Sequence, residues 1–384
     1  MNCYHISLTP IKNETKIFKF CSKICKKKLF RKIIIIGLYK KNLKIKENVN
    51  NEFELIRFKL LLNNKNFFFL KNIFCFTEFS IRVLRYIVFT GNKGDIVHLH
   101  HVSLLILVPI LKYFSRKVIY DAHELETEVC GLRGIKKLIY KFLEKRFIHK
   151  VNFSLFVSKS IENWYIENYK INNTYTIYNC PSFKDYSFSQ DKIKKEFKKI
   201  NNIDENNKIL IYQGALIRGR GIERLLDYFL RKNILNYALL ILGYGELEQL
   251  VKDYSNKCKN IIYKEAVSPN MINNITSNCD AGIVLFDESF LSYKYALPNK
   301  LFEYILSGIP VIGGGSIEME RIINEYQLGI YLTNYSDSAL KESIKAIDNI
   351  NINENIINRL KEKYDWDNQF ERMYNRYKYI NELQ

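Results

Sequence analysis

The chain has 384 residues, of which 47% are hydrophobic and 26% charged, a composition typical of a globular protein with room for two domains. Its net charge of +19 is uneven: residues 1–184 carry 33 Lys and Arg against 13 Asp and Glu, whereas residues 185–384 carry 26 against 27. A basic half suits binding to nucleic acid, to an anionic membrane or to a phosphate-bearing acceptor, or it is simply a solvated face. The chain has no zinc-finger spacing, RNP-like motif or recognition helix, which argues against nucleic acid.

Short apolar runs alternate with helical patterns through the first half, which predicts a parallel α/β domain. The run RKIIIIG at residues 31–37 is apolar on both faces, as a fully buried parallel strand is. Strands are predicted at residues 4–8, 32–37, 53–57, 96–99, 118–120, 155–157 and 176–178. Helices are predicted between them at residues 15–27, 73–89, 134–149 and 158–169.

A polar, charge-dense stretch at residues 184–208 predicts the connection to a second domain, in which the alternation restarts. Strands are predicted at residues 209–212, 238–242, 261–263, 281–285 and 311–313. Helices are predicted at residues 222–231, 246–255, 270–276, 299–306, 317–325 and 367–381. Doubly wound sheets of this kind bind ligands beyond the carboxyl ends of their strands, and a pair of them binds substrates in the cleft between domains.

The cysteines and the apolar stretches exclude several other classes. None of the eight cysteines forms a C-x-x-C pair, so there is no obvious zinc site, and we expect reduced, intracellular thiols. The first ten residues lack the long apolar run of a secretory signal. The most apolar stretch, residues 96–111, has 16 residues, whereas a bilayer span needs about 20. We expect a protein that touches a membrane without crossing it.

Two glycine-containing loops follow predicted strands of the second half. The loop at residues 213–221, QGALIRGRG, leads from a strand into an amphipathic helix, where glycines let backbone amides approach an anion and arginines grip phosphate oxygens. A glycine-rich turn with solvated arginines is the alternative. The Gly-x-Gly at residues 243–245 stands at the next strand end, where a second phosphate or sugar loop, or a simple tight turn, is expected.

The segment at residues 296–312, ALPNKLFEYILSGIPVI, is the most specific of these patterns. Pro298 and Asn299 begin a short helix, and Asn299 is predicted to cap its free amides. Glu303 lies one turn into this otherwise apolar helix, where an unpaired carboxylate is costly. Two ribose hydroxyls would satisfy this carboxylate, or it forms an internal ion pair, for which Lys300 is the candidate.

Histidines and carboxylates gather at strand ends of the first half. Asp121 and His123 directly follow a predicted strand, and no second histidine completes a zinc-protease motif. Such residues at the carboxyl end of a strand suit substrate binding, although a satisfied core histidine is the alternative. His98, His100 and His101 lie on a strand end and its loop, so at least one of them is expected to face the cleft.

Together these segments resemble glycosyltransferase family 4, a retaining, metal-independent group with the GT-B fold. The most specific match is PNKLFEY at residues 298–304. Residues 120–124, YDAHE, are similar to the family's DxHE segment, and Arg220 and Gly221 stand at its Lys/Arg-Gly pair. Further similarity covers nearly the whole chain, at residues 13–18, 95–109, 157–158, 177–181 and 364–367.

The resemblance implies an α/β GT-B fold, in which two doubly wound, Rossmann-like domains face each other across a cleft. We expect an N-terminal acceptor domain at residues 1–183 and a C-terminal domain that binds the nucleotide sugar at residues 184–365. A terminal helix at residues 366–384 is expected to pack back on the first domain. No cofactor and no metal ion is implied, because the nucleotide sugar is a substrate.

The resemblance also implies roles for particular residues. Arg220, with Arg218, binds the donor diphosphate, and residues 264–267 border the nucleobase. The expected catalytic residues are Arg220, Glu303, which holds the ribose, and His123, which lies by the donor sugar. The expected donor-binding residues come from the two loops and the PNKLFEY segment: Gly214, Arg218, Arg220, Gly221, Gly243, Gly245, Val267, Pro298, Asn299, Lys300, Leu301 and Glu303.

The chain departs from the family's pattern at two positions that bear on the donor, and also at His101, where the family has Asp. Tyr295 stands where the first Glu of the family's Glu-x7-Glu motif contacts the sugar, so the donor sugar is left open. Ala215 stands where the family often has an Arg, which places diphosphate binding on Arg218, Arg220 and Lys300.

The expected function is that of a hexosyltransferase-type enzyme that retains the configuration of the transferred sugar and needs no metal. The acceptor is expected to be a saccharide, or one linked to polyprenyl diphosphate, in bacterial cell-surface polysaccharide synthesis of the lipopolysaccharide, capsule or O-antigen type. Cations and helix ends would stabilise the leaving diphosphate.

The basic first domain is expected to bind an anionic membrane, since each Lys or Arg near such a surface contributes roughly 1 kcal/mol. This implies a cytoplasmic protein, peripheral on the inner face of the cytoplasmic membrane, with no nucleic-acid partner. Two alternatives remain: a nucleotide-sugar 2-epimerase, and a catalytically silent GT-B scaffold that binds nucleotide, which Tyr295 motivates.

Overall fold

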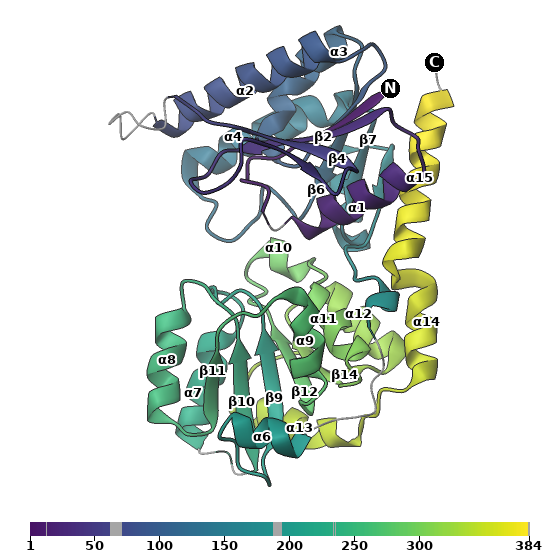
Figure 1. Ribbon diagram of the computed structural model, residues 1–384. Coiled ribbons are helices and arrows are strands. Elements are labelled where there is room, and N and C mark those ends of the chain that lie inside the picture. The colour runs from purple at the N-terminus through teal and green to yellow at the C-terminus, as the bar shows by residue number, and fades with distance from the viewer. Residues whose placement is uncertain (13, 62–70, 187–193, 233, 235, 383–384) are drawn as a thin grey trace. The chain divides into compact units, whose positions relative to one another are not determined.

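The computed structural model describes residues 1–12, 14–61, 71–186, 194–232, 234 and 236–382. They form two compact units, one of Met1–Ile177 with Phe370–Gln384 and one of Tyr178–Gln369. Each unit contains its own sheet and its own helices (Figure 1). Asn13, which opens one of the segments similar to the family, and residues 187–193 of the predicted connection lie outside the described residues.

The units divide after residues 177 and 369, whereas the sequence places the divisions after residues 183 and 365. Two hydrogen bonds explain the difference. The backbone amide of Tyr178 donates to Oε1 of Gln369 at 3.1 Å, and that of Phe183 donates to Oδ1 of Asp365 at 2.8 Å. These bonds tie the segment after residue 177 to the start of the terminal helix, so both belong to the second unit.

The first unit is built on an eight-stranded sheet of the order β3-β4-β2-β1-β5-β6-β7-β8. β3 pairs antiparallel with β4, and the other pairs are parallel. The strands are β1 (Asn2–Ile6), β2 (Lys32–Leu38), β3 (Lys46–Val49), β4 (Phe53–Phe58), β5 (Ile96–Leu99), β6 (Lys117–Ala122), β7 (Phe153–Phe156) and β8 (Thr174–Thr176). The helices are α1 (Thr15–Lys26), α2 (Lys71–Thr90), η2 (Val102–Leu107), α3 (Val108–Tyr113), α4 (Gly134–Phe147), η3 (Ile148–Lys150), α5 (Lys159–Tyr169) and most of α15 (Trp366–Glu382).

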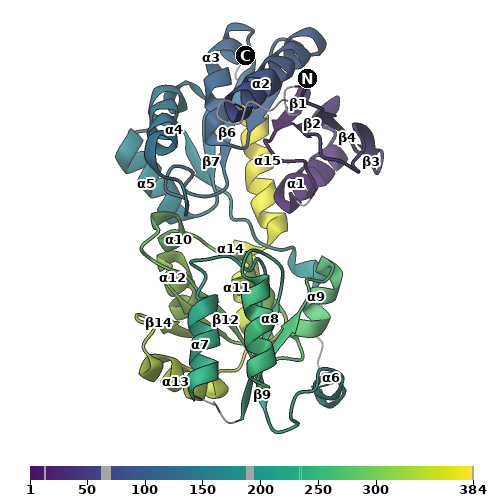
Figure 2. The ribbon, with the colours of Figure 1, turned by 90° about the vertical axis from the view of Figure 1, so that its left-hand side faces the viewer.

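Alternate residues of the central strands show which helices cover each face of this sheet. His5 of β1 packs against Phe20 of α1, and His98 of β5 packs against Tyr377 of α15. On the opposite face, Tyr4 of β1 packs against α2, while the hydroxyl of Tyr120 on β6 donates to Glu144 of α4. Helices α1 and α15 therefore cover one face, and α2 and α4 cover the other (Figure 2). No helix of the described residues is both long and apolar enough to cross a membrane.

The second unit has a six-stranded parallel sheet of the order β11-β10-β9-β12-β13-β14. The strands are β9 (Lys208–Gln213), β10 (Tyr237–Leu242), β11 (Ile261–Lys264), β12 (Ala281–Leu285), β13 (Val311–Gly314) and β14 (Gly329–Leu332). The helices are η4 (Phe183–Asp185), α6 (Lys194–Ile200), α7 (Ile222–Lys232), α8 (Glu248–Lys257), α9 (Pro269–Thr276), α10 (Leu291–Lys294), α11 (Asn299–Leu306), α12 (Ile317–Tyr326), α13 (Asp337–Ala346), η5 (Ile347–Asn349) and α14 (Glu354–Tyr364).

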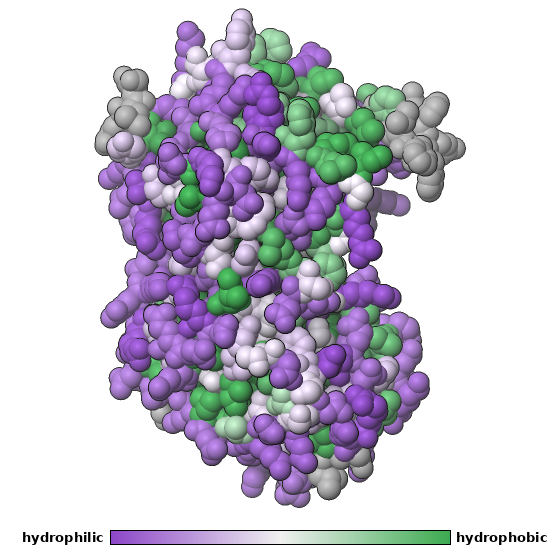
Figure 3. Space-filling model, turned by 180° about the vertical axis from the view of Figure 1, so that it is seen from behind, coloured by the Kyte–Doolittle hydropathy of each residue, from purple (hydrophilic) through white to green (hydrophobic). Residues whose placement is uncertain are grey.

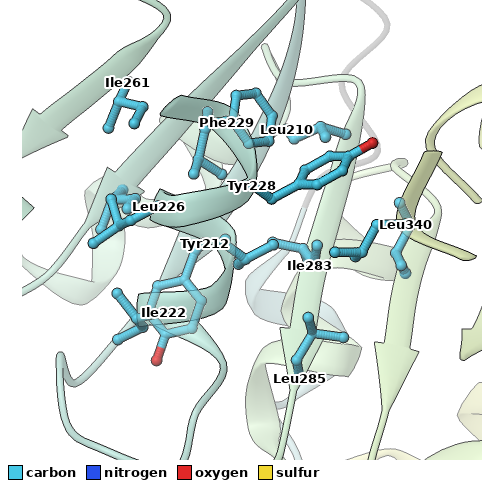
Figure 4. Close-up of a cluster of buried hydrophobic side chains, with 14 of the residues drawn as sticks. Leu210, Tyr212, Ile222, Leu226, Tyr228, Phe229, Ile261, Ile283, Leu285 and Leu340 are labelled. Atoms are coloured by element: carbon cyan, nitrogen blue, oxygen red, sulfur yellow. The ribbon is translucent and has the colours of Figure 1, made fainter. Parts of the chain in front are cut away.

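The core of the second unit lies between the sheet and the apolar stripe of α7. Leu226 and Phe229 of α7 are fully buried and meet Leu210 of β9 and Ile283 of β12 (Figure 4). Burying side chains of this size contributes about 1.5–3 kcal/mol each, which holds the helix against the strands. The loop that precedes α7 is thereby fixed at the carboxyl end of β9.

The order of strands fixes where each sheet can bind a ligand. In both sheets the chain winds in one direction from a central strand and then in the other, so the direction changes between β1 and β5 and between β9 and β12. Open parallel sheets bind ligands at such points, beyond the carboxyl ends of the strands. Candidate sites are therefore expected after β9 in the second unit and after β5 in the first.

Candidate functional site

In the second unit the two glycine loops are joined into one structure beyond β9 and β10. The amide of Gly214 donates to Leu242 at 2.9 Å, and that of Leu216 donates to Tyr244 at 2.9 Å. A Cβ on Gly243 would lie 1.9 Å from the carbonyl oxygen of Gly214, so this close approach requires glycine. Gly245 lies in the second loop and Gly221 ends the first, directly before α7. The predicted phosphate loops therefore lie side by side beyond the carboxyl ends of β9 and β10.

Two cations without full hydrogen bonding lie at this edge of the sheet. Lys300 is only 7% exposed, and its Nζ, 3.9 Å from the centre of the Tyr212 ring, has no hydrogen-bond partner among the described residues. A Cβ on Gly214 would lie 3.5 Å from this Nζ, so the ammonium lies against the glycine loop. Nε of Arg220 is also buried without a partner in the described part of the chain. Burial, and then the Arg220 guanidinium, hold the pKa of Lys300 well below its usual value.

A buried cation without a hydrogen-bond partner is costly, and a bound anion removes that cost. Because Lys300 and Arg220 are close enough to affect each other electrostatically, one ligand with two adjacent negative groups would serve both. The arrangement therefore suits a diphosphate.

Glu303 is held in place by a short chain of hydrogen bonds. Nε2 of Gln213 donates to its carboxylate at 2.6 Å, and Oε1 of Gln213 accepts from the hydroxyl of Thr276 at 2.7 Å. The carboxylate is half-buried, and its two oxygens offer several acceptor positions. Nζ of Lys300 has no hydrogen-bond partner among the described residues, so it does not donate to this carboxylate, although the charge of Glu303 acts to raise the pKa of Lys300.

Helix α11 carries both Lys300 and Glu303, and Tyr304 fixes it on the sheet. The hydroxyl of Tyr304 donates to Ile211 and accepts from the amide of Gln213, both at 3.1 Å. Gly282 of β12 makes room for the ring, since a Cβ there would lie 2.1 Å from it. Lys300 and Glu303 are therefore positioned by β9 and β12 through one aromatic side chain.

At the start of α11, the prediction that Asn299 caps the helix is wrong. Pro298 occupies the N-cap position, Asn299 is the first helical residue, and no side chain of the described residues caps the helix. Asn299 does not cap because it already has helical geometry, whereas a capping residue must lie before the first turn. The predicted end of the helix is confirmed: it ends at Leu306, and Gly308 follows in the left-handed region at φ +73°.

The remaining predicted donor residues occupy the surroundings. Leu301 is fully buried and fixes the first turn of α11. The side chain of Arg218 is exposed, while its backbone amide donates to Glu246 at 2.9 Å. Val267 is half-buried in the segment between β11 and α9. Tyr295, at the family's first glutamate position, is half-buried and ends α10.

In the first unit, His5, His100 and His123 form a largely buried array at the carboxyl ends of β1, β5 and β6. Nδ1 of His5 lies 2.9 Å from Nε2 of His100, and Nδ1 of His100 lies 3.0 Å from Nε2 of His123. Oδ1 of Asp121 accepts from the buried Lys16 ammonium at 2.5 Å, and Oδ2 lies 3.4 Å from Nδ1 of His100. His123 is thus the end of the array, and its side chain is 34% exposed.

The three histidines of the predicted strand end point in different directions. His98 and His100 share the face of His5, whereas His101 caps η2 by accepting from the amide of Ser103 at 3.1 Å. Nε2 of His101 lies 3.8 Å from Glu126, whose pKa burial raises to about 8. His100 is therefore the one that connects to His123.

Two groups of these side chains have the composition of a metal site: Cys3, His5 and His98, and His98, His100 and Asp121. The rings of His5 and His98 are stacked, with centroids 4.4 Å apart and planes at 22°. Nitrogen lone pairs lie in the ring planes, so stacked rings direct them side by side and not toward one ion. Since Asp121 also pairs with Lys16, the array fits hydrogen bonding better than metal binding.

Four residues of these sites received no role from the sequence. Gln213 and Thr276 orient Glu303. Gln213 follows a predicted strand directly, and an amide side chain there, which can both donate and accept hydrogen bonds, could have indicated a role in the site. Lys16 and His5 lie on α1 and β1, far from Asp121 in sequence. Only the order of strands brings them together.

Comparison with known proteins gives one family match. Residues 193–363 match the family model described as glycosyl transferases group 1, which covers most of the second unit. No curated protein matches the chain.

Many solved structures share the fold at low sequence identity. Sucrose-phosphate synthase from Thermosynechococcus elongatus has a TM-score of 0.80 at 14% identity, with all of both chains covered. HepE of Anabaena, in complex with UDP-glucose, has a TM-score of 0.73 at 13% identity, with 98% of this chain and 99% of that chain covered. WaaG, a glycosyltransferase involved in lipopolysaccharide biosynthesis, has a TM-score of 0.67 at 12% identity, with 97% and 98% covered. The chain therefore has the GT-B fold, as the sequence analysis predicted.

Proposed function

We propose that this protein is a glycosyltransferase that uses a nucleoside-diphosphate sugar as donor. The observation that carries the proposal is the pair of incompletely satisfied cations, Lys300 and Arg220, beside the oriented carboxylate of Glu303. The cations suit the diphosphate, and the carboxylate suits two ribose hydroxyls. The group 1 match over residues 193–363 supports the same reading, and the UDP-glucose complex of HepE makes a uridine nucleotide the first to test.

The proposed chemistry needs the cations most at the transition state. As the bond between the anomeric carbon and the diphosphate breaks, negative charge grows on the leaving oxygen, and fixed cations stabilise it more than they stabilise the bound donor. We place Arg220 and Lys300 in this role and expect no metal ion to be needed. Retention of configuration, with His123 by the donor sugar, belongs to the same proposal and rests on the family resemblance.

For the acceptor we propose a saccharide linked to polyprenyl diphosphate, used on the cytoplasmic side of an anionic membrane. The charge of residues 1–184, 33 Lys and Arg against 13 Asp and Glu, supports a negatively charged partner. The likeness to WaaG supports cell-surface polysaccharide synthesis as the pathway class.

One helix of the first unit has the surface that such a membrane contact needs. On α4, Ile135, Leu138, Ile139 and Phe142 are 50% to 76% exposed and lie on one side of the helix, at the spacing i, i+3, i+4 and i+7. Seen from behind, hydrophobic side chains gather on this part of the first unit (Figure 3). The same helix carries Lys136, Lys137, Lys141, Lys145 and Arg146, as interfacial helices do.

The test measures binding first and turnover second. Calorimetry across nucleoside diphosphates and nucleotide sugars should find one base preferred, with the affinity reduced about tenfold to a hundredfold in Arg220→Ala and in Glu303→Ala, since a hydrogen bond to a charged group is worth about 1.5–3 kcal/mol. Arg224→Ala, which changes an exposed arginine on α7 that bonds to Tyr335, is the matched control and should bind normally.

Turnover then separates the candidate functions. Release of nucleoside diphosphate that depends on an added lipid-diphosphate acceptor supports a transferase, and NMR of the product reports the anomeric configuration. Conversion of a nucleotide sugar without acceptor would indicate an epimerase, and binding without any turnover would indicate a silent scaffold. No binding by the folded protein would overturn the proposal.

A further inference from the structure

The hydrogen bonds of the histidine array in the first unit run in one direction, because the neighbouring Asp121 can only accept hydrogen bonds. Asp121 is 4% exposed and pairs with Lys16, itself 5% exposed. Burial alone would favour the neutral carboxyl, but the Lys16 ammonium and the neighbouring imidazoles hold the pKa of Asp121 well below its usual value. The carboxylate is therefore ionised and offers only acceptor positions.

This acceptor decides which nitrogen of His100 carries the proton. Nδ1 of His100 faces two atoms at once, Oδ2 of Asp121 at 3.4 Å and Nε2 of His123 at 3.0 Å. A lone pair on Nδ1 would lie 3.4 Å from the carboxylate oxygen, which is repulsive, whereas a proton on Nδ1 is attracted to it, and Nε2 of His123 lies farther from the same oxygen, at 3.8 Å. His100 therefore donates from Nδ1, and Nε2 of His123 accepts.

The other end of the array agrees with this direction. With its proton on Nδ1, His100 must accept at Nε2, and Nδ1 of His5, at 2.9 Å, supplies that proton. Nε2 of His5 is then an acceptor and lies 3.6 Å from Sγ of Cys3. Because burial raises the pKa of this thiol, it keeps its proton and can donate. Every contact from Cys3 to His123 then pairs one donor with one acceptor.

We propose that Lys16, Asp121 and His100 are positioning residues that hold His123 neutral, with its proton on Nδ1. Because Nε2 of His123 is occupied by His100, Nδ1 is the ring nitrogen left for a substrate, and it presents a hydrogen-bond donor there. The group it fits is an oxygen acceptor, such as a hydroxyl of the donor sugar. This role rests on the proposed transferase function, whereas the position of the proton does not.

Nuclear magnetic resonance of the whole protein, deuterated and labelled with 15N only at histidine, tests the position of the proton. Long-range 1H–15N spectra distinguish protonated from unprotonated ring nitrogens, and the signals of His123 are assigned by their loss in His123→Gln. We expect a protonated Nδ1 and an unprotonated Nε2 near neutral pH. A protonated Nε2 in the wild type would overturn the proposal, and no other variant is needed for this result.

A variant of Lys16 tests whether the array sets the proton. In Lys16→Met, Asp121 loses its cation and becomes protonated, so it can donate and no longer requires a proton on Nδ1 of His100. We expect the proton of His123 to move toward Nε2, while Lys16→Arg, which keeps the cation, retains the wild-type pattern. An unchanged His123 spectrum in Lys16→Met would contradict a positioning role.

Steady-state kinetics separate this inference from the proposed function. With donor and acceptor identified, we expect Lys16→Met to lower kcat about tenfold or more and to leave KM nearly unchanged, because the substrate contacts remain and only the orientation of a donor is lost. An unchanged kcat would overturn the positioning role even if the spectra are as expected. If the wild type has no activity, the proposed function fails, but the spectra still decide the position of the proton.

Discussion

At the scale of single residues, the proposed diphosphate would change the surroundings of Lys300. In the free protein its ammonium is buried and has no hydrogen-bond partner among the described residues. Methionine has a similar shape and no charge, so Lys300→Met should raise the free energy of unfolding by about 1–3 kcal/mol, less the contribution of the contact with Tyr212. The same change should weaken nucleoside diphosphate binding at least tenfold. Denaturant unfolding and calorimetry measure the two effects, and lower stability of the variant would contradict the account.

The pKa of Lys300 adds a pH dependence whose sign follows from linkage. The pKa is lower in the folded protein than in the unfolded chain, so folding releases protons, and the penalty is complete below the folded pKa. The gain in stability from Lys300→Met should therefore be largest at low pH and should disappear as the pH rises toward about 10.4, the unfolded value.

A diphosphate bound beside Lys300 favours the protonated form, so binding above the pKa of the free protein should take up protons. The binding enthalpy should then change with the ionisation enthalpy of the buffer in the wild type but not in Lys300→Met. Equal buffer dependence in both proteins would place the proton uptake elsewhere.

Glu303 allows a test in which the ligand is changed along with the protein. If its carboxylate accepts hydrogen bonds from the ribose hydroxyls, the wild type should bind its preferred nucleoside diphosphate more tightly than the 2′,3′-dideoxy analogue, by about 1.5–3 kcal/mol. Glu303→Ala should bind both ligands equally, and Gln213→Ala should show an intermediate preference, because Gln213 orients the carboxylate through its 2.6 Å bond. Calorimetric titrations with the two ligands give the comparison. A preference retained in Glu303→Ala would assign the ribose to another residue.

At the scale of elements, α4 has an exposed apolar side that includes Leu138 and Phe142. Leu138→Glu combined with Phe142→Glu should reduce binding to phosphatidylglycerol-containing vesicles at least tenfold, since each apolar side chain removed from water contributes about 1.5–3 kcal/mol. The matched control is Ile200→Glu with Met271→Glu, which changes two side chains that are 69% and 50% exposed on α6 and α9. Vesicle flotation compares the three proteins. Equal loss in the control, or no loss in the α4 variant, would contradict membrane contact through this helix.

The elements that the sequence predicts well are those that are buried on both sides. Residues 96–99, 281–285 and 299–306 coincide with β5, β12 and α11, because apolar runs bounded by glycine, proline or polar residues leave little choice. β3 and β14 were not predicted: each occupies a sheet edge, and the charges of β3 obscure its alternation. α13 and α14 were also missed, since their polar sequences pack only a narrow stripe and depend on the rest of the unit for stability.

The candidate sites also contain features that the sequence predicts and features that it does not. Glycines and the PNKLFEY segment identify the loops at the carboxyl ends of β9, β10 and β12, because each is local in sequence. Partnerships between distant residues could not be predicted: Gln213 contacts Glu303 across 90 residues, and Lys16 contacts Asp121 across 105. The order of strands in each sheet brings these residues together, and hydrophobic periodicity does not predict that order.

At the scale of the whole molecule, the two units divide the tasks proposed for the protein. The residues proposed to bind the nucleotide all belong to Tyr178–Gln369, whereas the excess of positive charge lies in residues 1–184. Binding to anionic vesicles should therefore weaken as ionic strength rises and charges are screened. The effect of Lys300→Met on nucleotide binding should be independent of vesicles.

This division predicts how ligands and substitutions act on thermal unfolding. A ligand that binds only the folded second unit stabilises it by about 2.7 kcal/mol at a hundred times its Kd, so a nucleoside diphosphate should raise one calorimetric transition. Tyr377 is fully buried in the first unit, where it packs against Phe20 and His98. Tyr377→Ala should lower the other transition, since truncating a buried aromatic side chain costs about 3–5 kcal/mol. If the nucleotide instead raises the transition that Tyr377→Ala lowers, and Arg220→Ala does not abolish that shift, the nucleotide binds in the first unit and the assignment of the donor site to β9 and α11 is wrong.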